Sequence, residues 1–301
     1  MASNVQAQPI RADSAVAVAP VGDSSARWRR RLAYAILIAY ALLMFIPFAW
    51  SLITSFKTLP DSVRLTLLPQ PFTLQGWQFA LTGPKPPVAQ MFVNSAIIAG
   101  VVTVTNLVLG SLAGYAFARL RFPGRELLFL VVLGTLMIPD QLRLVPVYLI
   151  MNGLGLTRGV GQYLAVILVL AIGGTSIFFM RQYFLSIPRD LEEAARIDGA
   201  GFFTTFLRVM LPLAGPALAA VAILQFQGTW NGFFWPVIFL QDPDHFTVQQ
   251  GLYFFRQAGG FSSNWPPLMA TVVMATIPVL VLYVFFQRYF VEGIAASGVK
   301  G

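Results

Sequence analysis

The sequence predicts an all-α membrane protein with six transmembrane helices and both termini in the cytoplasm. The 301-residue chain is 57% hydrophobic, only 11% charged and has a mean hydropathy of +0.71. One soluble core could not bury that much apolar surface. Charge-free runs of the roughly 20 residues that a spanning helix needs recur along the chain, and most of the basic residues fall in alternate segments between them.

The candidate spans can be placed by residue number. The third is interrupted by Asp140 and Arg143, and it is kept because the stretches on either side of this pair are apolar. Between the first two spans, Thr58 to Ala89 carries six prolines, which is typical of a loop with short elements at most. The six predicted spans are 32–56, 91–118, 127–150, 160–180, 211–240 and 267–287.

The distribution of Lys and Arg predicts the orientation. Basic residues collect on cytoplasmic loops, and cytoplasmic termini place 14 of the 20 inside. The net charge of +8 is then explained by topology, so no nucleic-acid partner is expected. The six basic residues left outside are Lys57, Arg64, Lys85, Arg143, Arg158 and Arg256.

We expect three segments: a disordered cytoplasmic tail at 1–26, a six-helix membrane domain at 27–290 and a cytoplasmic tail at 291–301. The chain has no cysteine, and its one histidine, His245, lies beside Asp242 and Asp244. Pro243 favours a solvated turn there over a metal site, so we expect this chain to bind no metal and no cofactor.

A polar island in the inner loop 181–212 stands out, because eight of the 32 charged residues fall between Arg181 and Arg208. Asp190 and Glu193 have the spacing of a reciprocally capped helix start, and Gly199 or Gly201 can end the helix in the left-handed conformation. The predicted helix of about 191–198 is too short to be stable undocked. It therefore needs a surface to bind.

The island also resembles a known family. Glu193-Ala-Ala-Arg-Ile-Asp-Gly-Ala200, followed by Phe206, Leu211-Pro212 and Pro216, is similar to the EAA loop of binding-protein-dependent ABC importer permeases, closest to the maltose-type carbohydrate-uptake group. Three further features occur in the same order: Ala116 to Arg125, then Phe226 with Trp230-Asn231, then the ending Gly298-Val-Lys-Gly301.

The resemblance implies a type I ABC importer permease fold and a set of partners. These are a second permease subunit forming a heterodimer, two copies of an ATPase subunit that use ATP and Mg, and an extracytoplasmic solute-binding protein, in a bacterial or archaeal cytoplasmic membrane. It implies that Gly298, Lys300 and Gly301 reach the ATPase, against the alternative of a frayed terminus. The residues implied to couple to the ATPase are Glu193, Ala194, Ala195, Asp198, Gly199, Phe202 and Phe206.

The fifth span carries amides and an indole: Gln225, Gln227, Trp230 and Asn231. Such side chains can line a sugar path, because Trp stacks on sugar rings and amides bond hydroxyls. They can equally join neighbouring helices. Both interpretations stay open.

The expected function is ATP-driven, binding-protein-dependent import of a carbohydrate or related polyol. An oligosaccharide is the first candidate solute, and a glycerol-3-phosphate-type solute is the alternative. The chain has no phosphate-binding loop, so it is not expected to be an enzyme. An ion-coupled secondary transporter is disfavoured by the scarcity of mid-span ionisable residues. An intramembrane enzyme is disfavoured because the spans lack hydrolase and metal motifs.

Overall fold

The structure is a computed structural model that describes residues 24–64, 66–83, 86–257 and 264–298. All the regular elements in these ranges are helical, as predicted. The chain divides into two compact units, Met1–Phe48 and Ala49–Gly301. Helix α1 (Ser24–Ser55) begins in the first unit and ends in the second.

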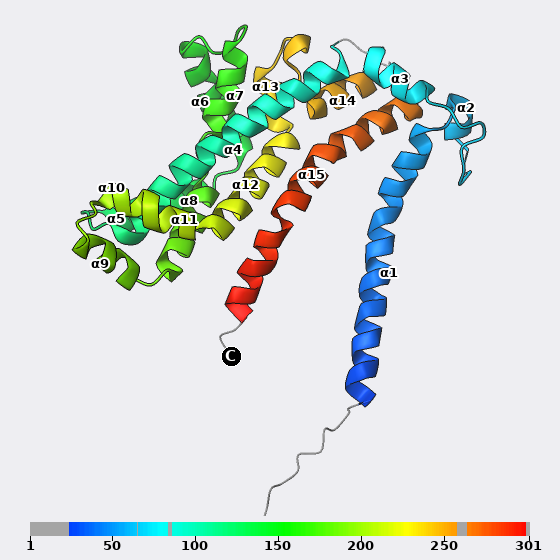
Figure 1. The fold of residues 1–301 in the computed structure, drawn as a ribbon. Coiled ribbons are helices and arrows are strands. Elements are labelled where there is room, and N and C mark those ends of the chain that lie inside the picture. Colours follow the sequence, from blue (N-terminus) through cyan, green and yellow to red (C-terminus); the bar gives the residue numbers. More distant parts are fainter. Residues whose placement is uncertain (1–23, 65, 84–85, 258–263, 299–301) are drawn as a thin grey trace, which may run out of the picture. The chain divides into compact units, whose positions relative to one another are not determined.

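The second unit contains two long helices, α4 (Val88–Arg119) and α15 (Trp265–Gly298), with shorter helices before and between them (Figure 1). A π-helical segment, Phe206–Met210, and a 3-10 turn, Pro243–His245, interrupt the series. The shorter helices are α2 (Leu59–Ser62), α3 (Gln75–Thr82), α5 (Arg125–Thr135), α6 (Asp140–Gly153), α7 (Gly161–Leu170), α8 (Gly174–Ser186), α9 (Asp190–Ile197), α10 (Phe202–Thr205), α11 (Leu211–Leu213), α12 (Gly215–Trp230), α13 (Phe234–Phe239) and α14 (Val248–Gln257).

Three of the predicted spans are single helices long and apolar enough to cross a membrane: Arg27–Ser55, Val88–Arg119 and Trp265–Phe286. The other three correspond to bent helix pairs within the described ranges. The bend is 102° between α5 and α6, 41° between α7 and α8, and 77° between Phe202–Leu213 and Gly215–Trp230. The described chain thus has three spanning helices, or up to six if each bent pair is one span.

Three predicted spans differ from the structure in continuity. The run 160–180 is divided between α7, which ends at Leu170, and α8, which begins at Gly174. The run 127–150 is broken by the turn that ends at Pro139, which has no backbone N–H to continue a helix. The run 211–240 is also not one helix: α12 ends at Trp230, and the turn at Asn231 and Gly232 separates it from α13. Apolar length alone therefore overestimated the continuity of these segments.

The packing of α4 against α8 depends on two glycines one turn apart. A Cβ built on Gly110 would lie 2.9 Å from the Cβ of Ser176, and one on Gly114 would lie 2.6 Å from the Cβ of Met180. Only glycine permits so close a backbone approach, which is a common device at interfaces between membrane helices. These residues let α8 lie directly on α4.

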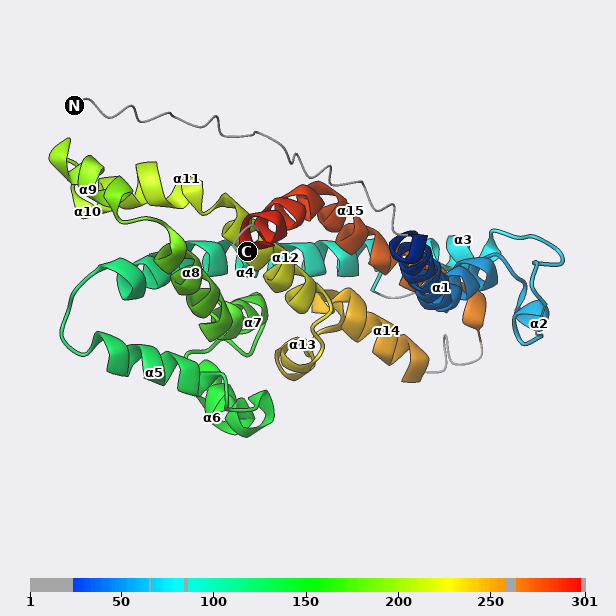
Figure 2. The ribbon, with the colours of Figure 1, turned by 90° about the horizontal axis from the view of Figure 1, so that it is seen from below.

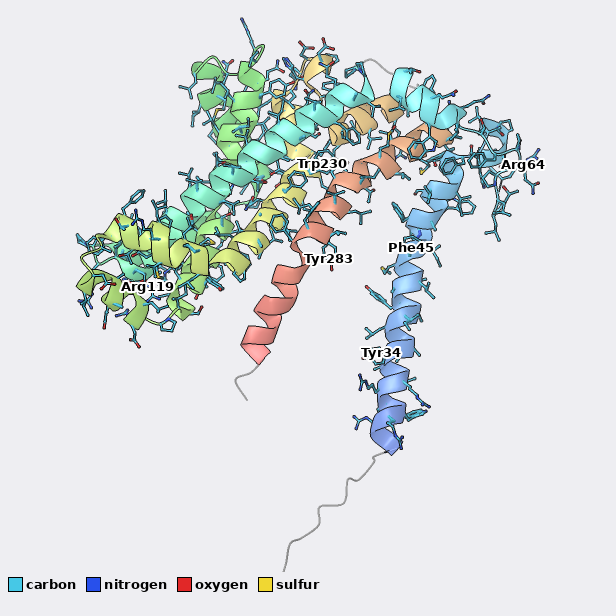
Figure 3. The ribbon with its side chains drawn as sticks, in the orientation of Figure 1. Tyr34, Phe45, Arg64, Arg119, Trp230 and Tyr283 are labelled. Carbon is cyan, nitrogen blue, oxygen red and sulfur yellow. The ribbon has the colours of Figure 1, made fainter. Side chains whose placement is uncertain are left out.

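Helix α12 packs against α4, α8 and α15, and Figure 1 shows it between α4 and α15. Trp230, labelled in Figure 3, closes the contact: its indole Nε1 donates to the carbonyl of Ala275 at 3.0 Å. Its ring stacks on Phe226 and meets the edge of Phe92. One indole thus joins α12, α4 and α15.

The two ends of α4 carry different groups. At its N-terminal end, Asn94 donates to the carbonyls of Asp244 and Phe246, and the hydroxyl of Tyr163 donates to Asn94. At its C-terminal end lie α9, α10 and α11, at the opposite end of α4 from α3 (Figure 2). Segments predicted to be outer loops therefore gather at one end of the second unit, and the polar island lies at the other.

A folded loop follows α1. Lys57, which is 1% exposed, donates to the carbonyl of Thr66 at 2.6 Å and lies 4.7 Å from the ring of Trp50. Asp61 accepts from the hydroxyl of Thr66 and from the backbone N–H of Gln70. That backbone hydrogen bond holds the pKa of Asp61 below its ordinary value of 3.8.

Candidate functional site

The polar island forms the predicted short helix, α9, which runs from Asp190 to Ile197. The expected reciprocal cap is absent: the N-cap residue is Arg189, and no side chain caps the helix start. Instead, Asp190, Glu192 and Glu193 lie in the first turn, where carboxylates interact favourably with the positive end of the helix dipole. The negative charge of these carboxylates therefore stabilises the start of α9 in place of the predicted capping hydrogen bonds.

The end of α9 agrees with the prediction for one of its two glycines. Gly199 has φ +83°, the left-handed conformation that favours glycine, and the N–H of Ala200 donates to the carbonyl of Ala195 at 2.9 Å. Gly201 instead has φ −72° and precedes α10. Asp198 and Gly199 thus form a tight turn between α9 and α10.

Helix α9 has an exposed face and a buried face. Glu193 and Ala194 are exposed, and Ile197 at the helix end is 87% exposed. Ala195 and Glu192 are buried. Isoleucine is usually buried and glutamate is usually exposed, but in α9 Ile197 is exposed and Glu192 is buried. Each face of the helix therefore needs a binding partner.

The partner of the buried face is Arg119, the last residue of α4, whose position is labelled in Figure 3. Arg119 Nε lies 3.0 Å from Glu192 Oε1, with side-chain exposures of 3% and 8%. The same guanidinium donates to the carbonyls of Phe184 and Ile187 at the end of α8. One arginine therefore joins α4, α8 and α9.

Aromatic packing fixes the chain after α9. Phe206 is 3% exposed and lies 5.1 Å from the ring of Tyr115 and 6.3 Å from that of Phe184, centroid to centroid. Phe202 remains 60% exposed, with the guanidinium of Arg196 5.1 Å from its ring. Of these two candidate coupling residues, Phe206 is part of the core and Phe202 is on the surface.

A cleft of about 530 Å³ opens beside the α9 and Arg119 contact. Four arginines and two glutamates line it, and Phe202 and Phe122 supply apolar surface. Such mixed charge suits a polar protein surface better than a sugar. The lining residues are Arg119, Leu120, Arg121, Phe122, Arg189, Glu192, Glu193, Arg196 and Phe202.

Only one of the three residues of the candidate tail contact lies within the part of the chain that the structure describes. Gly298 is the last residue of α15, whereas Lys300 and Gly301 lie outside the described residues. Helix α15 continues past residue 291, where the predicted tail begins.

The four candidate path residues on α12 have different surroundings. Trp230 is buried and bonded to Ala275, an arrangement that fits the helix-joining interpretation. Gln225 donates to the hydroxyl of Ser176 at 2.8 Å, which also joins helices. Gln227 is exposed, and Asn231 is exposed with its Oδ1 accepting from Gln249 at 3.2 Å. Gln227 and Asn231 are the two of these four residues that are exposed.

Gln225 belongs to a larger polar network at the bend between α7 and α8. Asn106 accepts from the N–H of Gly173 at 2.8 Å and from the hydroxyl of Ser176 at 3.0 Å. It also donates to the carbonyl of Leu170 at 2.7 Å. The groups that the broken helix leaves unpaired are therefore bonded by a side chain of α4, as a membrane interior requires.

Sequence reasoning missed Arg119, Glu192 and Ile197. Arg119 lies in the stretch Ala116 to Arg125 that resembles the family but has no predicted role, and Glu192 is not among the predicted coupling residues. The sequence held one signal, the placement of an arginine at the end of an otherwise charge-free span. Which carboxylate pairs with Arg119 depends on the tertiary fold.

Comparison with known proteins finds a matching family model. The family is described as "Binding-protein-dependent transport system inner membrane component", and its model matches residues 106–295. The matched region includes α9, Arg119, the bends and most of α15.

Several relatives are similar over most of their length. The chain is 38% identical over 276 residues to the arabinooligosaccharides transport system permease protein AraQ of Halalkalibacterium halodurans, covering 90% of this chain and 97% of that protein. It is 34% identical to the diacetylchitobiose uptake system permease protein NgcG of Streptomyces coelicolor, covering 90% and 89%. It is 32% identical to the sn-glycerol-3-phosphate transport system permease protein UgpE of Yersinia pestis, covering 77% and 83%.

A solved structure is similar as well. It is a crystal structure of a bacterial ABC transporter involved in the import of the acidic polysaccharide alginate. The TM-score is 0.76 at 26% sequence identity, covering 90% of this chain and 100% of the matched chain.

Proposed function

Because this chain belongs to the family of binding-protein-dependent transport system inner membrane components, we propose that it is the permease subunit of an ATP-driven carbohydrate importer. Members of this family are permease subunits without an ATPase site of their own. The proposed substrate is an oligosaccharide, since relatives that match 90% of this chain are named for arabinooligosaccharides and diacetylchitobiose. A glycerol-3-phosphate-type solute is the second candidate, because of the similarity to UgpE.

The proposed assembly contains a second, different permease subunit, two ATPase subunits that use ATP and Mg, and a solute-binding protein outside the membrane. The proposed location is a bacterial or archaeal cytoplasmic membrane, which the chain crosses six times with both termini inside. The predicted outer loops lie at one end of α4, and the polar island lies at the other end. This separation supports a chain whose successive loops alternate between the two sides of the membrane.

The observation that carries the proposal is the exposed face of α9. Glu193, Ala194 and the 87% exposed Ile197 protrude from a helix whose other face is fixed to the membrane domain. A large apolar side chain flanked by charge, on a rigid short helix, is the kind of anchor that fills a pocket on a partner protein. We assign that partner as the ATPase.

In the proposed cycle, ATP binding moves the ATPase subunits and with them α9, and the membrane helices then open alternately to either side. The binding protein delivers solute at the outer end, near the Asn94 contacts with Asp244 and Phe246. Exposed polar groups on α12, Gln227 and Asn231, are the proposed solute contacts.

The test is to purify the complete complex and measure ATP hydrolysis with the binding protein and a panel of solutes. We expect stimulation by an oligosaccharide and not by glycerol-3-phosphate. Stimulation only by glycerol-3-phosphate would establish the second candidate, and a wild-type complex stimulated by no solute would refute the carbohydrate importer.

The ATPase contact is tested separately with Ile197→Asp. This variant should fail to retain the ATPase during purification, because a buried unpaired carboxylate replaces an apolar anchor. The control is Leu154→Asp, at a residue that is 64% exposed between α6 and α7, which should retain the ATPase. Normal association of the Ile197 variant would remove α9 as the attachment point.

A further inference from the structure

Two adjacent acidic residues of α9, Glu192 and Glu193, have unlike surroundings. Glu193 is exposed on the cleft, whereas Glu192 is 6% exposed and paired with Arg119. Successive residues of an α-helix point about 100° apart, so one residue can face a docked partner while the next faces the membrane domain. The carboxylate of Glu192 therefore faces the membrane domain, and that of Glu193 faces the exposed cleft.

Arg119 makes the inner contact unusually specific. It is the last residue of α4, and its guanidinium reaches Glu192 together with the carbonyls of Phe184 and Ile187. The last carbonyls of a helix lack partners within that helix, and the fixed fork of arginine can hold several acceptors at once. A change in the tilt of α9 must therefore displace the ends of both α4 and α8 or break this buried contact.

A second attachment prevents α9 from moving as a free loop. Phe206, which follows the turn at Gly199, is held between Tyr115 of α4 and Phe184 of α8. The segment from α9 to the π-helix is thus attached to α4 and α8 at both ends, by the ion pair of Glu192 with Arg119 and by the aromatic packing of Phe206. These helices are themselves in direct contact through Gly110 and Gly114.

We propose that Glu192 and Arg119 are positioning residues that transmit movement of α9 to α4 and α8, and that Glu193 has no part in this step. The proposal rests on the proposed function, because it takes the moving partner of α9 to be an ATPase. It divides the acidic pair by role: Glu193 contacts the partner, and Glu192 passes the motion into the membrane helices.

The experiment compares Glu192→Gln with the matched control Glu193→Gln in the complete complex, reconstituted in vesicles with its ATPase and binding protein. For Glu192→Gln we expect normal assembly and an unchanged KM for ATP. Solute uptake per ATP hydrolysed should fall several-fold, because movement of α9 then no longer passes fully to α4 and α8. For Glu193→Gln we expect weaker ATPase retention and an unchanged ratio in the complexes that form.

A second variant, Arg119→Lys, keeps the charge but loses the fork, so it should show a partial fall in the same ratio. Arg158→Lys, at an exposed arginine between α6 and α7, is its control and should behave as wild type. Wild-type ratios in both Glu192→Gln and Arg119→Lys would overturn the proposal. Failure of both to assemble would also overturn it, because the pair would then only hold the fold together.

These outcomes differ from a failure of the proposed function. If the wild-type complex is not stimulated by any solute, the importer assignment fails before the variants are compared. If the wild type couples hydrolysis to uptake and the variants couple equally well, only the roles of Glu192 and Arg119 fail.

Discussion

Replacing Gly114 by alanine should loosen the contact between α4 and α8. The new Cβ would lie 2.6 Å from the Cβ of Met180 and 2.9 Å from the backbone nitrogen of Arg181. Carbon atoms prefer separations of about 3.5–4.0 Å, so the helices must separate by roughly 1 Å. The obstacle is largely backbone, and Met180 is fully buried.

The expected magnitude follows from two opposing effects. Overpacking costs about 1–3 kcal/mol, and alanine in a helix gains about 0.5–1 kcal/mol over glycine. The difference is a net loss of up to about 2.5 kcal/mol, and a mid-range value of about 1 kcal/mol corresponds to a fall in Tm of roughly 2–4 °C for a domain of this size.

Gly100 provides the matched control in the same helix, because a Cβ there meets no atom within 4 Å. Gly100→Ala should therefore raise the Tm by roughly 1–4 °C. The assay is retention of the detergent-solubilised complex on size exclusion after heating. A Gly114→Ala complex that melts at or above the wild-type temperature would refute the close-packing argument.

Three further predictions concern other contacts. Asn106→Leu should destabilise the protein by about 1–3 kcal/mol, because buried groups around Gly173 lose their acceptor; an unchanged Tm would contradict this. Since folding lowers the pKa of Asp61, its stabilising effect is present above pH 3.8 and is lost as the pH falls below it. Protease nicking of the loop should rise below that pH in the wild type but show no such dependence in Asp61→Asn, and equal profiles would exclude the carboxylate. Trp230→Phe should cost about 0.5–1.5 kcal/mol by removing the bond to Ala275 and leave the KM for uptake unchanged; a raised KM at unchanged stability would assign Trp230 to the solute path.

The positions of the long helices could be predicted from the sequence because hydrocarbon thickness imposes a minimum apolar length. The end of α9 at Gly199 could also be predicted, since it depends on a local backbone preference. Its start was predicted from a reciprocal cap that the structure does not contain. The bend between α7 and α8 could not be predicted. The break at Gly173 depends on Asn106, which is distant in sequence.

The candidate site was predictable as a segment but not as a set of roles. The family resemblance singles out Glu193, but nothing in the sequence assigns a role to Glu192, which the structure pairs with Arg119. Likewise, Phe202 and Phe206 both looked like a docking surface, yet Phe206 packs with Tyr115. Burial is a property of the assembled helices, so no local pattern reveals it.

The bend between α7 and α8 implies an order of assembly. Alone in lipid, this broken helix would expose the N–H of Gly173 and the carbonyl of Leu170 to hydrocarbon, which supplies no hydrogen bonds. Asn106 precedes both during synthesis, so α4 can already be in the bilayer when the broken helix enters. Gln225, which bonds Ser176, emerges only later. Asn106 of α4, which is synthesised first, thus stabilises a bend that α7 and α8 could not stabilise alone in lipid.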